Sequence, residues 1–351
     1  MQHYAGIDVS VEASSVCVVD GSGKVVREAK VASEPESLVD WFAGLGVDLE
    51  RIGLEAGPLS QWLYAALSAA GLKVELLETR HVRAAFKTMP VKTDRSDARG
   101  IAELMRVGWF RPVHCKSLSA QETRALLTAR RLMMDKLHDL ELSLRGLLRN
   151  FGLKVGKTTP KTYEARITDL TCGHPMLETI AAALLAARAE LARQFASLDR
   201  QVRAQARRSD PAKLLMTTPG VGAIVALDYV CAIDDPARFR SSQRVGAYFG
   251  LTQRRYQSGE TDIAGRISKL GDKQVRASLY EAANVILTRS AKVSGLKDWA
   301  QALARRVGMR KAKVALARKL AVVMHRMLID QTPFNPAIGN PAIGLPAAKA
   351  N

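Results

Sequence analysis

The sequence of 351 residues lacks the features of a membrane protein, of a secreted protein and of a protein stabilised by structural zinc. No apolar run reaches the roughly 20 residues that a membrane-spanning helix needs. Residues 1–10 carry neither a basic n-region nor a small-residue cleavage site, so we expect no secretion signal. The four cysteines form no C-x-x-C pair and signal neither a zinc site nor a disulfide framework. We therefore expect a cytoplasmic protein in a reducing compartment.

Acidic residues are also scarce, and their distribution is uneven. The chain has 52 Lys and Arg against 34 Asp and Glu, a net charge of +18, which predicts a polyanionic partner. Nucleic acid is the first candidate and a membrane surface the second. The charge is −3 over residues 1–110, +6 over 111–202 and +15 over 203–326. We interpret this gradient as chemistry or metal binding in the first third and phosphate binding in the last.

The hydrophobic pattern predicts an α/β region followed by helical regions. Short apolar runs indicate three antiparallel strands and then a strand, a helix and a strand, which is the element order of the ribonuclease H fold. Leucines at three- and four-residue steps then predict two long helices that pair as a coiled-coil hairpin. The predicted domains are 1–112 (α/β), 113–208 (helical arm), 209–332 (α-helical, DNA-binding) and 333–351 (disordered, proline-rich tail).

Four carboxylates form the first candidate site. Asp8 and Glu55 lie in or at the end of apolar strands, and Asp94 and Asp97 share one face at the start of a predicted helix. Such carboxylates repel one another unless a hard cation lies among them, and Mg²⁺ prefers these ligands. Two ions would stabilise both the attacking and the leaving oxygen at a phosphodiester. The alternatives are an N-cap and helix-dipole role for Asp94 and Asp97, and a surface role for Glu55.

The basic third holds the second candidate site. Residues 218–226 form a Pro-Gly-Val-Gly turn before an apolar helix, which is typical of a helix-hairpin-helix phosphate site or of a plain turn between helices. In the loop predicted at 250–259, Ser258 follows paired arginines and is either a nucleophile or an ordinary turn serine. The basic run 305–319 fits a helix that follows a nucleic-acid backbone. Trp299 could stack on a base or anchor the core, and the histidines show no ligand spacing. The predicted nucleic-acid contacts are Gly220, Gly222, Arg254, Arg255, Tyr256, Arg266, Lys269, Arg305, Arg306, Arg310, Lys311 and Lys313.

Three segments carry a resemblance to a known family. Gly6-Ile7-Asp8, Leu54-Glu55-Ala56-Gly57 and Lys92 to Ala98 resemble the Asp-Glu-Asp-Asp motifs of the insertion-sequence-110 transposases. That family joins a RuvC-like domain to a C-terminal transposase domain. It is also similar to pilin-gene invertases, and some members are bridge-RNA-guided recombinases. Arg254-Arg255-Tyr256-Gln257-Ser258-Gly259 resembles the family segment that holds a nucleophilic serine, and the segment around Ser268 resembles a second family motif.

The resemblance implies specific roles. Asp8, Glu55, Asp94 and Asp97 would bind Mg²⁺, Ser258 would form a phosphoserine with DNA, and Ser268 would be structural or contact phosphate. It implies a bacterial, nucleoid-associated homo-oligomer, a dimer or tetramer, with active centres shared between protomers. It also implies donor and target DNA and a structured non-coding guide RNA as partners.

Three other functions fit part of the pattern. A hydrolytic RuvC-like junction resolvase would use the carboxylates and leave Ser258 inert. An actin-like phosphotransferase would share Gly6-Ile7-Asp8, but it needs a second Asp-x-Gly loop that the sequence lacks. A non-catalytic architectural DNA binder would make the carboxylates coincidental.

Overall fold

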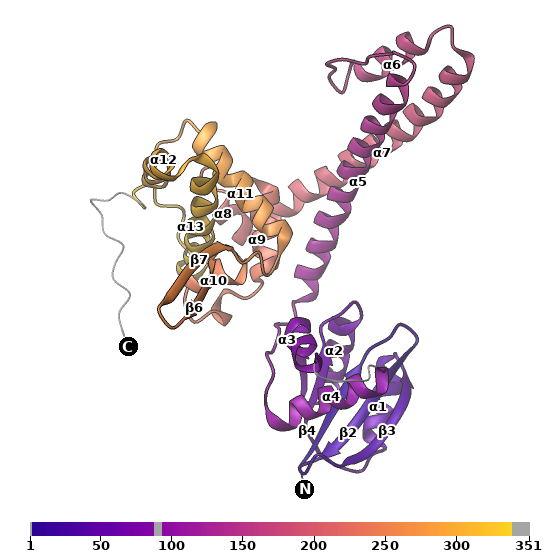
Figure 1. Ribbon diagram of the computed structural model, residues 1–351, viewed down its shortest axis with the longest axis vertical. Helices are drawn as coiled ribbons and strands as arrows, with labels where there is room; N and C mark the ends of the chain where they lie inside the picture. The colour runs from indigo at the N-terminus through magenta and orange to yellow at the C-terminus, as the bar shows by residue number, and fades with distance from the viewer. Residues whose placement is uncertain (1, 88–92, 339–351) are drawn as a thin grey trace. The chain divides into compact units, whose positions relative to one another are not determined.

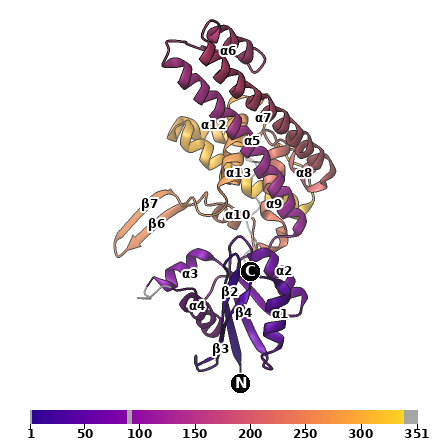
Figure 2. The ribbon, with the colours of Figure 1, turned by 90° about the vertical axis from the view of Figure 1, so that its right-hand side faces the viewer.

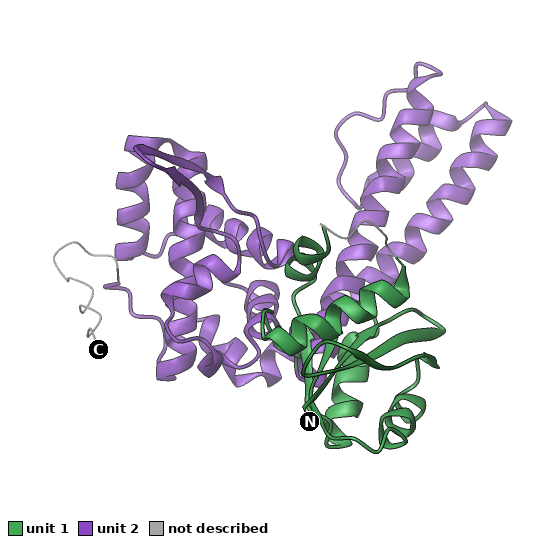
Figure 3. Cartoon of the chain, turned by 60° about the horizontal axis from the view of Figure 1, so that its bottom comes forward, with its two compact units in different colours: residues 1–116 green, residues 117–351 purple. Residues whose placement is uncertain are grey.

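The computed structural model describes residues 2–87 and 93–338, and the chain divides into two compact units (Figure 3). Unit 1 comprises Met1–Lys116 and unit 2 comprises Ser117–Asn351. Unit 1 is mixed α/β and unit 2 is mainly helical, consistent with the expected RuvC-like domain followed by a helical region. No helix in the described parts of the chain is long and apolar enough to cross a membrane.

Unit 1 is built around one five-stranded sheet. The strands follow the order β3-β2-β1-β4-β5, with β1 antiparallel to β2 and parallel to β4. The predicted three antiparallel strands followed by a strand, a helix and a strand are therefore observed, and the last two strands, β4 and β5, are parallel. The elements are β1 (His3–Asp8), β2 (Ala13–Asp20), β3 (Val25–Ala32), α1 (Pro35–Ala43), β4 (Leu49–Glu55), α2 (Ser60–Ala69), β5 (Val74–Leu77), α3 (Thr79–Phe86) and α4 (Asp94–Val107).

Helices cover both faces of this sheet because successive strand residues point to opposite sides. In β1, Ala5 and Ile7 belong to the apolar cluster that contains residues of α1 and α2. Tyr4 belongs instead to the cluster that contains Ile101 and Met105 of α4. The sheet is thus the middle of three layers, with α4 on one side and α1 and α2 on the other (Figure 2).

Helix α4 lies unusually close to the sheet at two glycines. Gly6 of β1 and Gly53 of β4 are paired across the parallel strands. A Cβ atom at Gly6 would lie 2.2 Å from the Ala98 carbonyl oxygen, and one at Gly53 would lie 2.6 Å from the Ile101 Cγ2 atom. Any larger side chain would push α4 outward, so these glycines set the height of the helix and of its N-terminal carboxylates.

Unit 2 begins with a long helical hairpin. Helices α5 (Leu118–Arg149) and α7 (Pro175–Arg208) pack along each other, and α6 (Tyr163–Thr171) covers their far ends (Figure 1). Leu144, Tyr163 and Ile167 form part of a small separate core there. At the other end, Ala120 and Leu127 of α5 enter the main core of the unit. The predicted arm is therefore observed as two long helices rooted in the helical region.

The remaining helices pack around the roots of α5 and α7. Tyr229, Phe249 and Met324 are among the residues buried in this core. The elements are α8 (Asp210–Leu215), α9 (Ala223–Ile233), the 3-10 turn η1 (Pro236–Arg238), α10 (Gln243–Tyr248), α11 (Lys273–Thr288), α12 (Gly295–Val307) and α13 (Met309–Asp330), with β6 (Gln253–Ser258) and β7 (Thr261–Ile267) between α10 and α11.

Two expectations for this region were wrong. The segment around Ser258 was expected as a loop in an all-helical domain, but β6 and β7 form an antiparallel hairpin that projects from the helices (Figure 2). Gly259 is the first residue of the two-residue turn and has φ of +55°. Such turns need a positive φ at this position, which is why they favour glycine. Residues 333–338 of the expected disordered tail contact the helices, since Phe334 and Ile338 pack on the core and the Pro336 carbonyl accepts from the Gly295 amide. Proline excludes helices and sheet ladders but not such packing. Residues 339–351 lie outside the described residues.

We predict that Gly6→Ala destabilises unit 1 by about 1–3 kcal/mol, because the new methyl group collides with the backbone of α4. Gly21→Ala is the matched control, because its Cβ would meet nothing closer than the Gln2 carbonyl oxygen at 3.8 Å. It should change stability by no more than about 0.5 kcal/mol. Urea denaturation of both variants measures the difference, and equal midpoints would contradict the close-packing account.

Candidate functional site

Two of the predicted acidic residues lie side by side at one edge of the sheet. In the parallel pair β1–β4, Ile7 is aligned with Leu54, and each strand ends one residue later, at Asp8 and Glu55. Both carboxylates are half-buried. Parallel strands bring their carboxyl ends together, so strand pairing alone places these two acids at one edge.

The other two acids open helix α4. Thr93 is the N-cap: its hydroxyl accepts from the Ser96 amide at 3.1 Å, and the Ser96 hydroxyl accepts from the Thr93 amide at 2.9 Å. Thr93 and Ser96 therefore cap the helix, which is the role that the alternative interpretation gave to Asp94 and Asp97. Asp94 and Asp97 follow in the first turn, just before Ala98, which lies against Gly6.

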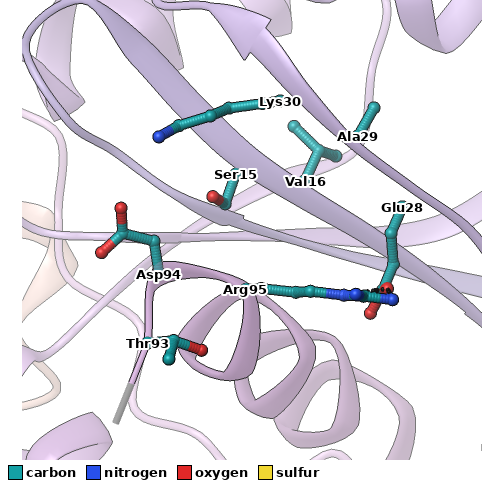
Figure 4. Close-up of a pocket in the computed structure, with 8 residues that line it drawn as sticks. All are labelled: Ser15, Val16, Glu28, Ala29, Lys30, Thr93, Asp94 and Arg95. Atoms are coloured by element: carbon teal, nitrogen blue, oxygen red, sulfur yellow. Dashed lines mark hydrogen bonds and ion pairs between the residues drawn. The ribbon is translucent and has the colours of Figure 1, made fainter.

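A cleft of about 520 Å³ lies beside Asp94, between β2, β3 and the start of α4. Figure 4 shows Asp94, Ser15 and Lys30 on one side of it, while Arg95 turns to the other side and pairs with Glu28. Lys30 and Ser15 were not among the predicted site residues. Single positions in a strand carry no pattern that marks them as neighbours of a distant helix.

The acidic residues suit a hard divalent cation by their chemistry. Four carboxylates offer the oxygen ligands that Mg²⁺ prefers. Within residues 2–87 and 93–338, no three Asp, Glu, His or Cys side chains already converge as a cation site. The oxygen donors of the four acids suit a hard cation, and the structure places them as two pairs, Asp8 beside Glu55 at the strand ends and Asp94 with Asp97 in the first turn of α4.

Ser258 lies at the end of the β6–β7 hairpin in unit 2. It pairs with Thr261 across the turn and is exposed. Tyr256, two residues earlier, is 66% exposed, and Arg254 and Arg266 are also exposed. Lys269 follows at the hairpin base with φ of +55°. These four predicted contacts are thus exposed on the surface of the hairpin and its base.

Arg255 has an internal partner that sequence reasoning missed. Its Nε atom donates to Asp262 Oδ1 at 2.7 Å and its Nη2 atom donates to Asp262 Oδ2 at 2.5 Å. The hydrogen bond from Arg255 lowers the pKa of Asp262, so the pair is intact at neutral pH and is lost only as the pH falls through that lowered pKa. The carboxylate occupies the two donors with which arginine also binds phosphate.

The predicted glycine turn connects α8 and α9 and gives its two glycines different surroundings. A Cβ atom at Gly220 would lie 2.7 Å from the Ala282 carbonyl oxygen, and its φ is +76°, so this glycine allows α11 to pack closely. Gly222 is exposed and is the N-cap of α9. Of the two, Gly222 has the exposure that a phosphate contact needs.

The basic run continues across the corner between α12 and α13. Arg305 and Arg306 lie in the last turn of α12, where the helix dipole favours cations. Arg310 and Lys311 are exposed in the first turn of α13, where the dipole disfavours them. Lys313 lies 5.9 Å from the Tyr280 ring centre. Helix stability does not explain the cations at the start of α13. Trp299 is partly buried on the core and its ring is covered by Lys319, which favours the anchoring role.

Two models of transposase families match separate parts of the chain. The DEDD transposase model of IS110 elements matches residues 5–152, and the model described as "Transposase IS116/IS110/IS902 family" matches residues 212–320. The chain belongs to the IS110 family of transposases. The transposase for insertion sequence element IS1111A of Coxiella burnetii is 27% identical over 94% of this chain and 90% of its own length. A probable family 20 transposase of Pseudomonas aeruginosa is 27% identical over 94% and 98%. The IS1328 transposase of Yersinia enterocolitica is 25% identical over 81% and 85%.

This transposase also has a buried polar network that the sequence did not reveal. Asp228 of α9 is 1% exposed, and it accepts from Gln274 at 2.6 Å and from Ser278. Burial raises the pKa of Asp228, while the hydrogen bond from Ser278 and the charge of Arg124 oppose the rise. Asp272 caps α11 and pairs with Arg124. The Asp-before-helix signal could have identified the cap, but not its partner on α5.

The buried His325 has a structural explanation. One ring nitrogen lies 2.9 Å from the Ser242 hydroxyl and the other lies 3.0 Å from the Pro236 carbonyl oxygen. Burial lowers the pKa of His325. Both nitrogens have partners, which agrees with assigning the histidine no catalytic role.

We predict that Asp262→Asn strengthens DNA binding, because it releases Arg255 to contact phosphate. Each additional phosphate contact should steepen the slope of log K against log salt concentration by about 0.9. Glu260→Gln is the matched control, because it removes the same charge from the same hairpin and leaves the Arg255–Asp262 pair intact. Binding titrations at several salt concentrations measure both slopes. Equal slopes for the two variants would show that net charge alone matters.

Proposed function

We propose that this transposase cleaves and exchanges DNA strands through a covalent phosphoserine at Ser258, using a Mg²⁺-binding site formed by Asp8, Glu55, Asp94 and Asp97. The observation that carries the proposal is the place of Ser258. Its hydroxyl is exposed beside the turn of a projecting hairpin that also presents arginines. An ordinary turn serine would not need this concentration of cations.

The proposed reaction exchanges one oxygen–phosphorus bond for another. The Ser258 Oγ atom would attack phosphorus and form an O–P bond, while the bond from phosphorus to one deoxyribose oxygen breaks. The serine loses a proton and the released sugar hydroxyl gains one, so no water is consumed. A second DNA strand end can then reverse the reaction and complete the exchange. Guanidinium groups at Arg254 and Arg255 would neutralise charge that develops on the phosphate oxygens.

The carboxylates would serve the same phosphate through a metal ion. When bound, Mg²⁺ would lower the charge repulsion that opposes attack on a phosphodiester. Asp8 and Glu55 would hold it from the strand ends, and Asp94 and Asp97 from the first turn of α4. The capping box at Thr93 and Ser96 supports this role, because it caps the helix without either aspartate.

The net positive charge and the family membership both indicate nucleic-acid partners. We propose donor and target DNA, and a structured guide RNA, along the basic surface of α12, α13 and the hairpin. A protein that binds the nucleic-acid backbone through charge does not itself need to recognise the sequence, because base pairing between the RNA and the DNA can do so. We further propose a dimer or tetramer in which one protomer supplies carboxylates and another supplies Ser258. RNA that copurifies with the protein would separate the guided reaction from an unguided one.

We predict that Ser258→Ala abolishes the covalent protein–DNA adduct and leaves DNA binding unchanged, because only the attacking oxygen is removed. The protein is incubated with element-end DNA, co-expressed RNA and Mg²⁺, and adducts are separated on a denaturing gel. Thr261→Ala is the matched control, because Thr261 carries the hydroxyl on the other side of the same turn.

The Thr261→Ala variant should form the adduct at the wild-type level. Cleavage that persists in Ser258→Ala without any adduct would favour the hydrolytic junction resolvase instead.

A further inference from the structure

The β6–β7 hairpin that bears Ser258 has a rigid base. A Cβ atom at Gly250 would lie 2.0 Å from the Leu270 carbonyl oxygen, and one at Gly271 would lie 2.1 Å from the Tyr248 carbonyl oxygen. The Ser268 amide also donates to the Thr252 carbonyl at 2.8 Å. The two ends of the hairpin are therefore held together by close backbone contacts that no side chain could enter.

One arginine fastens this base to α11. A single Nη1 atom of Arg276 donates to the carbonyl oxygens of Phe249, Leu270 and Gly271, at 3.1, 2.9 and 3.0 Å. Asp272, which follows Gly271, caps α11 by accepting hydrogen bonds from the amides of Gln274 and Val275. The exit of the hairpin and the start of α11 thus behave as one piece.

Arg124 connects that piece to the arm. It lies near the start of α5, and its Nη2 atom contacts both carboxylate oxygens of Asp272, at 2.8 and 2.7 Å. Its Nη1 atom lies 3.7 Å from Asp228 Oδ1 and is buried without a hydrogen-bond partner in the described part of the chain. One guanidinium therefore spans α5, α9 and the cap of α11.

This network is a poor way to gain stability. Charges lose hydration on burial, and apolar residues of similar volume often replace a buried ion pair without loss. The donor left without a hydrogen bond adds a further cost. What the guanidinium provides is a fixed geometry, because a planar group that is hydrogen-bonded to Asp272 and lies 3.7 Å from Asp228 permits few arrangements.

We propose that Arg124 is a positioning residue, which holds the hairpin of Ser258 in a fixed orientation to the root of the α5–α7 arm. The inference rests on the proposed function, since it takes Ser258 as the nucleophile. It goes further because it makes the root of the arm part of the structure that orients this serine.

The test compares two arginines on the same helix. Arg124→Met removes the connection to Asp272. Arg130→Met makes the same chemical change about two turns later, where the arginine pairs with Asp199 of α7. The measurements are hydrogen exchange of the amides in residues 253–267, the rate of adduct formation and the affinity for element-end DNA.

We expect Arg124→Met to speed exchange in the hairpin and to slow adduct formation by about 10- to 100-fold, the scale of a misplacement near 1 Å. DNA affinity should stay unchanged. Arg130→Met should match the wild type in all three measurements. Asp272→Asn is a second variant that keeps a capping side chain on α11 and weakens the pair, and it should act in the same direction as Arg124→Met.

Unchanged exchange and unchanged adduct rate in Arg124→Met and Asp272→Asn would overturn the inference. Equal losses in Arg124→Met and Arg130→Met would also overturn it, because they would indicate a general effect on helix α5. Absence of any Ser258-dependent adduct in the wild type would overturn the proposed function instead, and hydrogen exchange would still report whether Arg124 holds the hairpin.

Discussion

The close contact between α4 and the sheet is the constraint on which the acidic site depends. It exists because Gly6 and Gly53 are neighbours on adjacent parallel strands and present no side chain to the helix. Ile101 and Met105, both fully buried, fill the space beside them. The first turn of α4 is thereby held near the strand ends that carry Asp8 and Glu55. A small change in the height of this helix would move two of the four carboxylates relative to the other two.

Unit 2 shows a different arrangement of rigid and exposed parts. Its hairpin is exposed along most of its length, but the base is fixed by glycine contacts, by Arg276 and by the Asp272–Arg124 pair. Ser258, the proposed nucleophile, is therefore exposed on a hairpin whose base is held in orientation. The Arg255–Asp262 pair adds an internal competitor for phosphate, so that a DNA backbone must displace a carboxylate to engage this arginine. Part of the positive charge on the β6–β7 hairpin is therefore already paired with a carboxylate before any ligand binds.

Local sequence patterns predicted most of the architecture. The order of strands and helices along unit 1, the helix that starts near Asp94 and the two long helices follow from apolar periodicity and capping residues. The hairpin was missed because its residues are exposed and polar, although Ser258-Gly259 is a turn signal. The ion pairs of Arg124 and Arg255 were not predicted. Asp272 is 148 residues from Arg124, and no local pattern encodes such a contact. The family resemblance, rather than chemistry alone, singled out Ser258 among many surface serines.

The central claim is that carboxylates on unit 1 enable Ser258 to form a bond with DNA, and mass spectrometry tests it directly. Trypsin cleaves after Arg255 and Arg266, so Ser258 is released in the peptide Tyr256–Arg266. After incubation with element-end DNA, RNA and Mg²⁺, nuclease treatment should leave a nucleotide on Ser258 of the wild-type peptide and none on the Asp8→Asn peptide. Cleaved DNA with an unmodified peptide, or equal modification in both proteins, would contradict the account.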